Sequence, residues 1–268
     1  MVTTDLRRPL CIRPSFGFAA VLLVALALLA PEVAFAQQRV LPAPTGSFPL
    51  AKRVHLFEQP GRAKWQKPGR IVKVLGIKPG MTIADIGAGS GYFTRRFAKA
   101  TGPNGKVYAV DISKDILEYL KNRAQKEGLT NISTIVGKPD NPLLPDDSVD
   151  LAFFSETTHH IGHRTEFFRK VRASLKPNGR MAIIDFSPEA HGKGWCPHQP
   201  SELVPEWQII REAEDAGFKV DRIYNFVSRE YFVVFDKGKA TWHEPTAQTS
   251  EHEPRSNPAN TAPSHRSE

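Results

Sequence analysis

The segment Ile83-Ala-Asp-Ile-Gly-Ala-Gly-Ser-Gly-Tyr-Phe93 decides the fold of this 268-residue chain. Its first residues form an apolar run typical of a buried strand, and an amphipathic helical pattern over 91–101 follows the turn. Glycines at such a place let the backbone turn sharply and come close to a ligand, while the helix N-terminus offers unpaired N–H groups. The segment therefore predicts a strand, a ligand-binding turn and a helix.

Further along the chain, strand-like and helix-like segments alternate, which is typical of a parallel sheet with helices on both faces. Gly128 and Gly217 stand where helices are expected to end, and Lys176-Pro-Asn-Gly179 predicts a turn. The expected strands are 82–86, 106–110, 132–136, 149–155, 180–185, 219–225 and 231–235, and the expected helices are 91–101, 114–127, 164–175 and 205–216.

The last two expected strands are joined by only a few residues around Ser228-Arg229. A parallel pair needs a long crossover, so these two strands are expected to be antiparallel. The predicted fold class is therefore α/β, a Rossmann-like three-layer sandwich. Its seven-stranded sheet is mostly parallel and ends in a C-terminal antiparallel hairpin.

Two carboxylates flank the glycine turn and indicate what it binds. Asp85 is an acid inside an apolar strand, which is costly unless it has a partner, and a cationic ligand such as a sulfonium amino acid would be one. Asp111 ends the second strand, where it could accept both hydroxyls of a ribose, and Ile112 could lie against a purine. Two other interpretations stay open: Asp85 bonded to N–H groups of the turn, and Asp111 as the N-cap of a helix.

The turn itself, with Gly87, Gly89 and Gly91, departs from the dinucleotide-binding pattern. That pattern places its third glycine one residue later, where Tyr92 stands. A nicotinamide-dependent oxidoreductase is therefore the weakest of the functions considered.

An ordered series of motifs resembles the class I methyltransferase superfamily, which uses S-adenosylmethionine. The series covers 55–236, and the chain also resembles secreted methyltransferase-domain proteins through Phe-Glu-x-Pro-x-Arg-x-x-Trp-Gln at 57–66. The resemblance implies that the cofactor lies over the carboxyl ends of the first strands and that the substrate is held by loops after strands four and five. The motifs are Leu75-Gly-Ile-Lys-Pro-Gly80, the turn from Ile83 to Gly91, Val107-Tyr-Ala-Val-Asp111, Leu144-Pro-Asp-Asp-Ser-Val-Asp150 and Leu175-Lys-Pro-Asn-Gly179.

One position departs from the superfamily, which usually has an acidic or other polar partner for the adenine amino group after the third strand. Here Lys138 stands there, and Asp140 is the expected substitute. The residues expected to bind S-adenosylmethionine are Asp85, Gly87, Gly89, Gly91, Asp111, Ile112 and Asp140.

The segment Ser155-Glu-Thr-Thr-His-His-Ile-Gly-His163 follows the fourth strand. Methyl transfer is an in-line displacement that needs alignment, and a base only where the nucleophile must lose a proton. Glu156, His159 and His160 are therefore the candidates for catalytic base or substrate contact. An Asn-Pro-Pro-Tyr-type motif for amide or adenine nitrogen is absent here, so we expect a small-molecule substrate and no nucleic acid.

A metal site is not expected from the sequence. Possible ligands are present, but no paired-Cys or His-Glu-x-x-His spacing supports one, and adjacent histidines usually point apart. These possible ligands are His159, His160, His163, His191, Cys196 and His198.

Three further side chains have two interpretations each. Trp65 and Gln66 either cover the cofactor site as a lid or pack against the edge of the sheet. Trp195 either lines the substrate pocket or is an exposed loop aromatic.

The ends of the chain differ from its middle. Residues 1–36 predict a signal peptide, because three arginines precede an apolar stretch and Ala34-Phe35-Ala36 fits the cleavage rule. A linker over 37–54, the domain over 55–236 and a disordered tail over 237–268 follow. We therefore expect a periplasmic or secreted protein that contacts the membrane only if the signal is uncleaved. The sequence sets no oligomeric state.

The formal net charge of +8 is spread along the domain without a run of like charges, which favours a solvated surface over a polyanion-binding face. The sequence thus predicts an exported S-adenosylmethionine-dependent methyltransferase that acts on a small or lipid-like molecule. The alternative is a non-catalytic binding protein of the cell envelope that keeps the fold.

Overall fold

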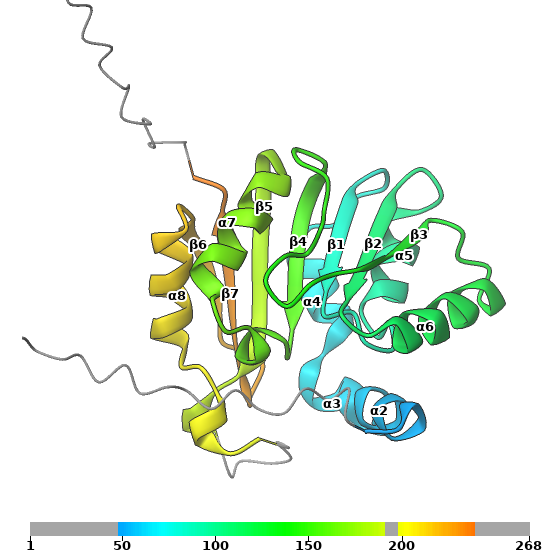
Figure 1. Cartoon of the computed structure of the whole chain (residues 1–268), viewed down its shortest axis with the longest axis horizontal. Helices are drawn as coiled ribbons and strands as arrows, with labels where there is room; N and C mark the ends of the chain where they lie inside the picture. The colour runs from blue at the N-terminus through cyan, green and yellow to red at the C-terminus, as the bar shows by residue number, and fades with distance from the viewer. Residues whose placement is uncertain (1–47, 191–197, 239–268) are drawn as a thin grey trace, which may run out of the picture. The chain divides into compact units, whose positions relative to one another are not determined.

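The computed structural model describes residues 48–190 and 198–238. Seven strands form one sheet in the order β3-β2-β1-β4-β5-β7-β6 (Figure 1). The five strands from β3 to β5 are parallel, and β7 runs antiparallel to both of its neighbours. The strands are β1 (Thr82–Ile86), β2 (Lys106–Asp111), β3 (Ile132–Val136), β4 (Val149–Ser155), β5 (Leu175–Phe186), β6 (Lys219–Tyr224) and β7 (Glu230–Asp236).

Helices cover both faces of the sheet, which confirms the predicted three-layer architecture. Helices α4, α5 and α6 pack on one face and α7 and α8 on the other. Two short helices, α2 and α3, precede them and lie below the sheet in the view of Figure 1. The helices are α2 (Leu50–Phe57), α3 (Arg62–Gln66), α4 (Pro68–Val74), α5 (Thr94–Thr101), α6 (Lys114–Lys126), α7 (Arg164–Ser174) and α8 (Glu206–Asp215), with 3₁₀ turns η2 (Thr158–His160), η3 (Pro188–Ala190) and η4 (Pro200–Glu202).

The centre of the sheet carries aromatic side chains on both faces. Phe153 and Phe154 are consecutive in β4 and fully buried, and successive strand residues point to opposite faces. On one face, Phe153 lies 4.8 Å from Phe93 and 4.9 Å from Phe97 between ring centroids, and on the other Phe154 lies 5.9 Å from Phe168. Each buried ring contributes about 1.5–3 kcal/mol, so β4 fixes both helical layers.

Two expected features of the backbone are confirmed. Gly128 follows α6 with a φ of +70°, and Gly217 follows α8 with a φ of +91°. Both values lie in the left-handed region in which helices commonly end and which favours glycine.

Most bounds lie within a few residues of those expected, α4 was not among the expected helices, and two differences are larger. β5 begins at Leu175, so the expected turn over 176–179 lies inside the strand, where the pairing with β4 shifts register between Val149 and Leu151. α2 begins at Leu50, inside the stretch expected to be a linker over 37–54. This helix is only 8 residues long and follows a proline-rich stretch, so the composition of the segment did not reveal it.

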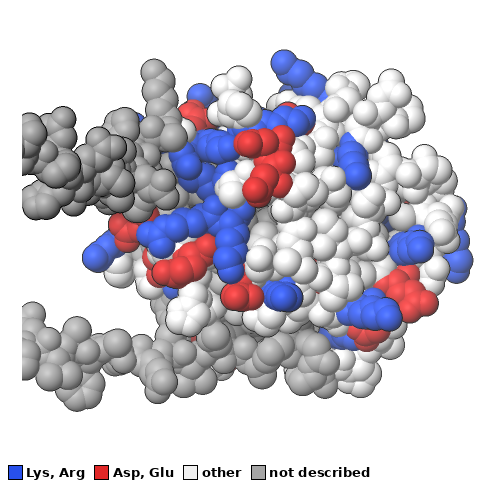
Figure 2. All heavy atoms as spheres, turned by 45° about the horizontal axis from the view of Figure 1, so that its top comes forward, with Lys and Arg blue, Asp and Glu red and all other residues white. Residues whose placement is uncertain are grey.

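The edge strand β6 is almost entirely exposed and carries charged side chains, which discourage pairing with another sheet edge. On the face shown in Figure 2, Lys and Arg are interspersed with Asp and Glu. In the described part of the chain, no helix combines the length and the apolar character needed to cross a membrane. The expected signal peptide, Trp195, and the tail beyond residue 238 lie outside the described residues.

The strand order reverses between β1 and β4, because the chain passes from β1 outward to β3 and then returns to β4. In open α/β sheets, ligands bind outside the carboxyl ends of the strands at such a switch point. The glycine turn follows β1 and the histidine-containing segment follows β4, so the fold brings both to this place.

Candidate functional site

The glycine turn joins β1 to α5, and its three glycines, Gly87, Gly89 and Gly91, have φ values of +76°, +52° and +82°. A Cβ on Gly87 would lie 2.1 Å from the hydroxyl oxygen of Thr157, so only glycine fits there. A Cβ on Gly89 would lie 3.1 Å from the ring of Phe57. The turn is therefore held between the segment after β4 and the last residue of α2.

Asp85 lies in β1 just before the turn and is 2% exposed. Its carboxylate accepts a hydrogen bond from the hydroxyl of Thr94, at the start of α5. Burial raises the pKa of Asp85 to about 7, against the hydrogen bonds from Thr94. The hydrogen-bond partners found are thus the side chain and backbone of Thr94, and a cationic partner would favour the ionised form.

Asp111 ends β2 and faces the same turn. Its carboxylate accepts the N–H of Gly89 at 2.9 Å and the N–H of Ser113 at 3.0 Å. Burial raises the pKa of Asp111, and these two N–H groups oppose the rise. Ser113 is the residue that precedes α6, so Asp111 supports the entry to this helix. A carboxylate has about four acceptor positions, so lone pairs remain for ligand hydroxyls.

The other two residues expected at the cofactor behave differently. Ile112 is 54% exposed, which is compatible with an apolar side chain that a flat ligand covers on binding. The Asp140 carboxylate lies 3.5 Å from the ammonium group of Lys170 in α7 and is mostly exposed. No contact links Asp140 to Asp111 or the glycine turn among the described residues, and its role at the adenine stays a prediction.

Helices α2 and α3, together with the residues that join them, form what we call the cap. Glu58 accepts hydrogen bonds from the hydroxyl of Ser90 in the glycine turn at 2.8 Å and from Arg95 in α5 at 2.7 Å. Arg53 of α2 is 4% exposed, donates to the Ser113 hydroxyl at 2.8 Å and forms an ion pair with Asp115. The cap is therefore tied to the turn and to the start of α6.

Trp65 and Gln66, expected either to cover the cofactor site or to pack against the edge of the sheet, lie in different surroundings. The Trp65 ring stacks on Phe186 at the end of β5, with ring centroids 6.1 Å apart, so it packs against the sheet edge. Gln66 is fully buried and donates to Glu156 at 2.8 Å and to Glu230 at 3.0 Å. Gln66 therefore contacts the candidate residue Glu156, and its role as a lid over the cofactor stays a prediction.

Glu156 follows β4 with a positive φ of 54°. Its carboxylate accepts hydrogen bonds from Arg62 and Gln66, each at 2.8 Å. Glu230, fully enclosed nearby, has its pKa raised well above the ordinary value by burial and by the charge of Glu156. The two carboxyls therefore share the amide of Gln66 as a donor, and burial favours the protonated form of Glu230.

His159 and His160 form η2 directly after Glu156 and Thr157. The Nδ1 atom of His159 lies 2.7 Å from a carboxylate oxygen of Asp185, at the end of β5. Asp185 is fully buried, yet the charge and hydrogen bond of His159 outweigh that burial and lower its pKa. Burial lowers the pKa of the neighbouring His198 to about 4, with the charge of His159 adding to the effect. The ring of His198 also lies close to the two candidate histidines, with its centroid 4.4 Å from that of His159.

Several of these residues were not singled out by the sequence pattern. Asp185 carries the same signal as Asp85, an acid at the end of an apolar strand, and could have been found by it. For the others, Arg53, Thr157 and Glu230, the local sequence holds no signal because their partners lie in distant segments. Two possible ligands, His191 and Cys196, lie outside the described residues.

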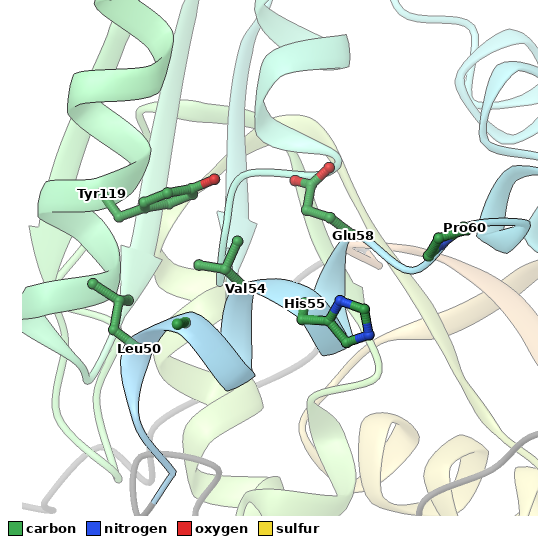
Figure 3. Close-up of a pocket in the computed structure, with 7 residues that line it drawn as sticks. Leu50, Val54, His55, Glu58, Pro60 and Tyr119 are labelled. Atoms are coloured by element: carbon green, nitrogen blue, oxygen red, sulfur yellow. The ribbon is translucent and has the colours of Figure 1, made fainter.

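An open hollow of about 590 Å³ lies beside this site, between α2 and α6 (Figure 3). Tyr119 of α6 and Val54 of α2 line it, and Asp85, Gly87 and Asp111 do not. It touches the site only through Glu58, so it borders the cap and is not the cofactor-binding turn itself.

The residues around the turn fit S-adenosylmethionine. The ammonium group of the ligand would supply the cation that buried Asp85 lacks, and the free lone pairs of Asp111 suit ribose hydroxyls. Exposed Ile112 offers an apolar surface for the adenine ring.

Comparisons with known proteins agree with this assignment. A family model described as a methyltransferase domain matches residues 77–228, more than half of the chain. A ubiquinone/menaquinone biosynthesis C-methyltransferase from Burkholderia cenocepacia is 31% identical over 152 residues, which are 57% of this chain and 60% of that protein. The protein of the same name from Ectopseudomonas mendocina is 28% identical over 117 residues, 43% of this chain and 46% of that protein. The chain therefore spans about half of the length of these curated relatives.

A solved structure shows the same similarity over a whole domain. The crystal structure of an S-adenosylmethionine-dependent methyltransferase from Aquifex aeolicus is 31% identical, with a TM-score of 0.65, and covers 70% of this chain and 98% of its own. These matches show that the chain belongs to the methyltransferase domain family.

Proposed function

We propose that this chain is exported and transfers a methyl group from S-adenosylmethionine to a small, lipid-like acceptor held beside η2. One observation carries the proposal: Thr157 contacts Gly87 so closely that no side chain would fit on the glycine. The segment that bears Glu156, His159 and His160 is therefore in direct contact with the cofactor-binding turn. Acceptor and methyl donor would meet at this edge of the sheet.

The residues of the chain divide the work of the reaction. S-adenosylmethionine supplies an activated methyl group when bound. Asp85 would hold the ammonium group of the cofactor and Asp111 its ribose, which would fix its orientation, the main requirement of an in-line displacement. The cap closes over the glycine turn through Glu58 and keeps water from the reacting groups.

The side chains after β4 would hold the acceptor. Arg62 and Gln66 fix the Glu156 carboxylate, and Asp185 fixes the ring of His159. An acceptor that must lose a proton would give it to this group of residues.

The proposed acceptor class rests on the relatives and on the surface near the site. The relatives from Burkholderia cenocepacia and Ectopseudomonas mendocina are named as C-methyltransferases of ubiquinone and menaquinone biosynthesis. Trp65 stacks on Phe186, and buried Phe186 lies 6.2 Å from His198 between ring centroids. An aromatic ring with an apolar tail suits these surroundings.

Export is supported by the sequence of residues 1–36, with its arginines, apolar stretch and small residues at the expected cleavage point. Expression of the full chain in a Gram-negative host, followed by fractionation and N-terminal sequencing, tests it. We expect a periplasmic product that begins at Gln37. A full-length product in the cytosol would contradict export without touching the proposed reaction.

Calorimetry of residues 37–268 with S-adenosylmethionine, S-adenosylhomocysteine and NADH tests the cofactor. We expect binding of the first two and none of NADH, and Asp221→Ala, on the exposed strand β6, serves as the matched control. Methyl transfer is then measured with labelled S-adenosylmethionine and a panel of demethylated quinols, phenols, amines and thiols. Transfer to amines or thiols alone would contradict the proposed acceptor class, and binding without any transfer would favour a non-catalytic protein.

A further inference from the structure

Among the described residues, three histidines bring their ring nitrogens together. His159, His160 and His198 each offer one nitrogen, and these atoms lie within 4.8 Å of one another. The ring centroids of His159 lie 4.1 Å from His160 and 4.4 Å from His198. We call these three residues the histidine cluster. Because η2 and the residues before η4 are separate segments, tertiary folding and not local sequence assembles it.

His159 is oriented as a ligand would be. Its Nδ1 atom lies 2.7 Å from Asp185, which also accepts the hydroxyl of Thr158 at 2.5 Å and the N–H of Phe186 at 2.9 Å. Asp185 is thereby fixed. When the ring is neutral, as a metal ligand must be, a proton on Nδ1 leaves the lone pair of the ring on Nε2.

The Nε2 atom of His159 is buried and has no hydrogen-bond partner among the described residues. A buried polar atom without a partner costs about 1–3 kcal/mol. Burial is nearly complete, since the side chain of His159 has 0% exposure. The Nε2 atom of His159 is therefore a candidate for binding a ligand.

His198 repeats the arrangement from the other segment. Its Nδ1 atom lies 3.7 Å from the Glu202 carboxylate, and Glu202 in turn accepts the N–H of Gln199 at 2.8 Å. Metal-binding histidines almost always have a carboxylate, carbonyl or water at their second ring nitrogen. His159 therefore has a hydrogen-bonded carboxylate at this outer position, and His198 has a carboxylate nearby.

We propose that the histidine cluster binds one divalent transition-metal ion, with Zn²⁺ as the reference ion. Imidazole ligands suit Zn²⁺ and its neighbours, whereas Mg²⁺ and Ca²⁺ prefer oxygen. With Zn–N bonds of about 2.0–2.1 Å, ligands of a tetrahedral site lie roughly 3.3 Å apart, so small side-chain rotations would complete the geometry. Three histidines leave one position for water or for an oxygen of the acceptor.

This proposal reverses the expectation from the sequence, which was that no metal binds. Adjacent histidines point apart in a strand, but here they lie in a 3₁₀ turn, and their rings are close together. A link between the ion and the acceptor rests on the proposed function, because η2 adjoins the segment that contacts Gly87. Binding of the ion itself does not rest on the proposed function.

Titration of residues 37–268 with Zn²⁺, in competition with a chromophoric chelator, tests the site after metal is stripped. His243, His252 and His265 are first changed to Ala, because these histidines near the C-terminus could bind metal weakly. We expect one ion per chain, and a d–d absorption band of low-coordinate geometry with Co²⁺. Absence of stoichiometric binding by folded protein would overturn the proposal.

Variants locate the ion. His159→Ala and His198→Ala should each weaken Zn²⁺ binding at least about 100-fold, and Asp185→Asn about 10–100-fold, since outer partners typically matter by that amount. His163→Ala is the control, because His163 is an exposed histidine of the same segment and outside the cluster.

Circular dichroism checks that each variant is folded, and His198→Ala decides if the buried His159 cannot be replaced. Equal loss of binding in His163→Ala and His198→Ala would contradict the site. Because methyl transfer is not measured, failure here is distinguishable from failure of the proposed function.

Discussion

Asp85 and Asp185 occupy similar places in the two halves of the site, and their carboxyls behave in opposite ways. Each is a buried acid near the end of a central strand, β1 or β5, with a threonine hydroxyl as donor. The pKa of Asp85 is raised to about 7 by burial, whereas that of Asp185 is lowered because the charge and hydrogen bond of His159 outweigh burial. Asp85 therefore forms no ion pair within the described residues, whereas Asp185 is already paired with His159.

The largest effect that would sharpen this comparison is the pH dependence of stability that Asp85 causes. Its pKa rises from 3.8 in the unfolded chain to about 7 in the folded protein, so the native state holds the proton more tightly. The stability from this proton is complete below pH 3.8 and is lost as pH rises through about 7, by about 4 kcal/mol at 1.36 kcal/mol per unit.

Urea unfolding of the ligand-free wild type and of Asp85→Asn from pH 4 to pH 8 measures this difference. We expect the variant to lose this decline and to gain stability over the wild type as pH rises. If the free energy of unfolding changed with pH in the same way in both proteins, the contrast between Asp85 and Asp185 would be contradicted.

The next effect concerns Asp185, where removing the carboxylate leaves His159 and the hydroxyl of Thr158 buried without their acceptor. Breaking a buried, hydrogen-bonded pair costs about 3 kcal/mol or more. Urea unfolding of metal-stripped Asp185→Ala at pH 7 should show this loss, and exposed Asp221→Ala should stay within about 0.5 kcal/mol of the wild type. A loss below 1 kcal/mol for Asp185→Ala would mean that its pairing is not what holds η2 in place.

A third effect separates binding from stability at the cofactor half. Asp111→Ala should weaken S-adenosylmethionine binding about 100-fold, because two charge-assisted hydrogen bonds to the ribose are lost at about 1.5 kcal/mol each. Glu118→Ala, an exposed acid of α6, is the control and should leave the affinity unchanged. Unaltered affinity in folded Asp111→Ala would show that this carboxylate serves only the turn and the start of α6.

The smallest effect is expected at the cap. Glu58→Gln removes an ion pair with Arg95 while keeping an acceptor for Ser90. Because the Glu58 side chain is 19% exposed, the stability loss should be at most about 1 kcal/mol. Thermal unfolding measures it, and a larger loss would mean that the cap contributes more to the fold than to the site.

Much of the fold could be predicted because it depends on local patterns. The strands β1, β3 and β4 have the bounds that their apolar runs predict, and the ends of α6 and α8 fall at their glycines. The cofactor half of the site follows for the same reason, since Asp85 and the glycines lie within a few residues of one another. The short helices α2 and α4 were not among the expected helices, β5 begins earlier than expected, and several other bounds differ by a few residues.

The acceptor half could not be predicted to the same depth, because its contacts join distant segments. Gln66 and Glu230 are 164 residues apart in sequence and yet hydrogen bonded. The meeting of His198 with His159 depends on how the segment after β5 returns to the sheet, and no local periodicity records that path. The sequence supplied the candidate histidines but not their arrangement.

The position of β7 has a consequence for the way the chain acquires its structure. Among the described strands, β7 is the last in sequence, yet it lies between β5 and β6, and β6 pairs with β7 alone. Any process that delivers the chain from its N-terminus, whether synthesis or passage across a membrane, leaves the sheet open at β5 until Glu230–Asp236 emerges. The strand order thus makes completion of this sheet a late event.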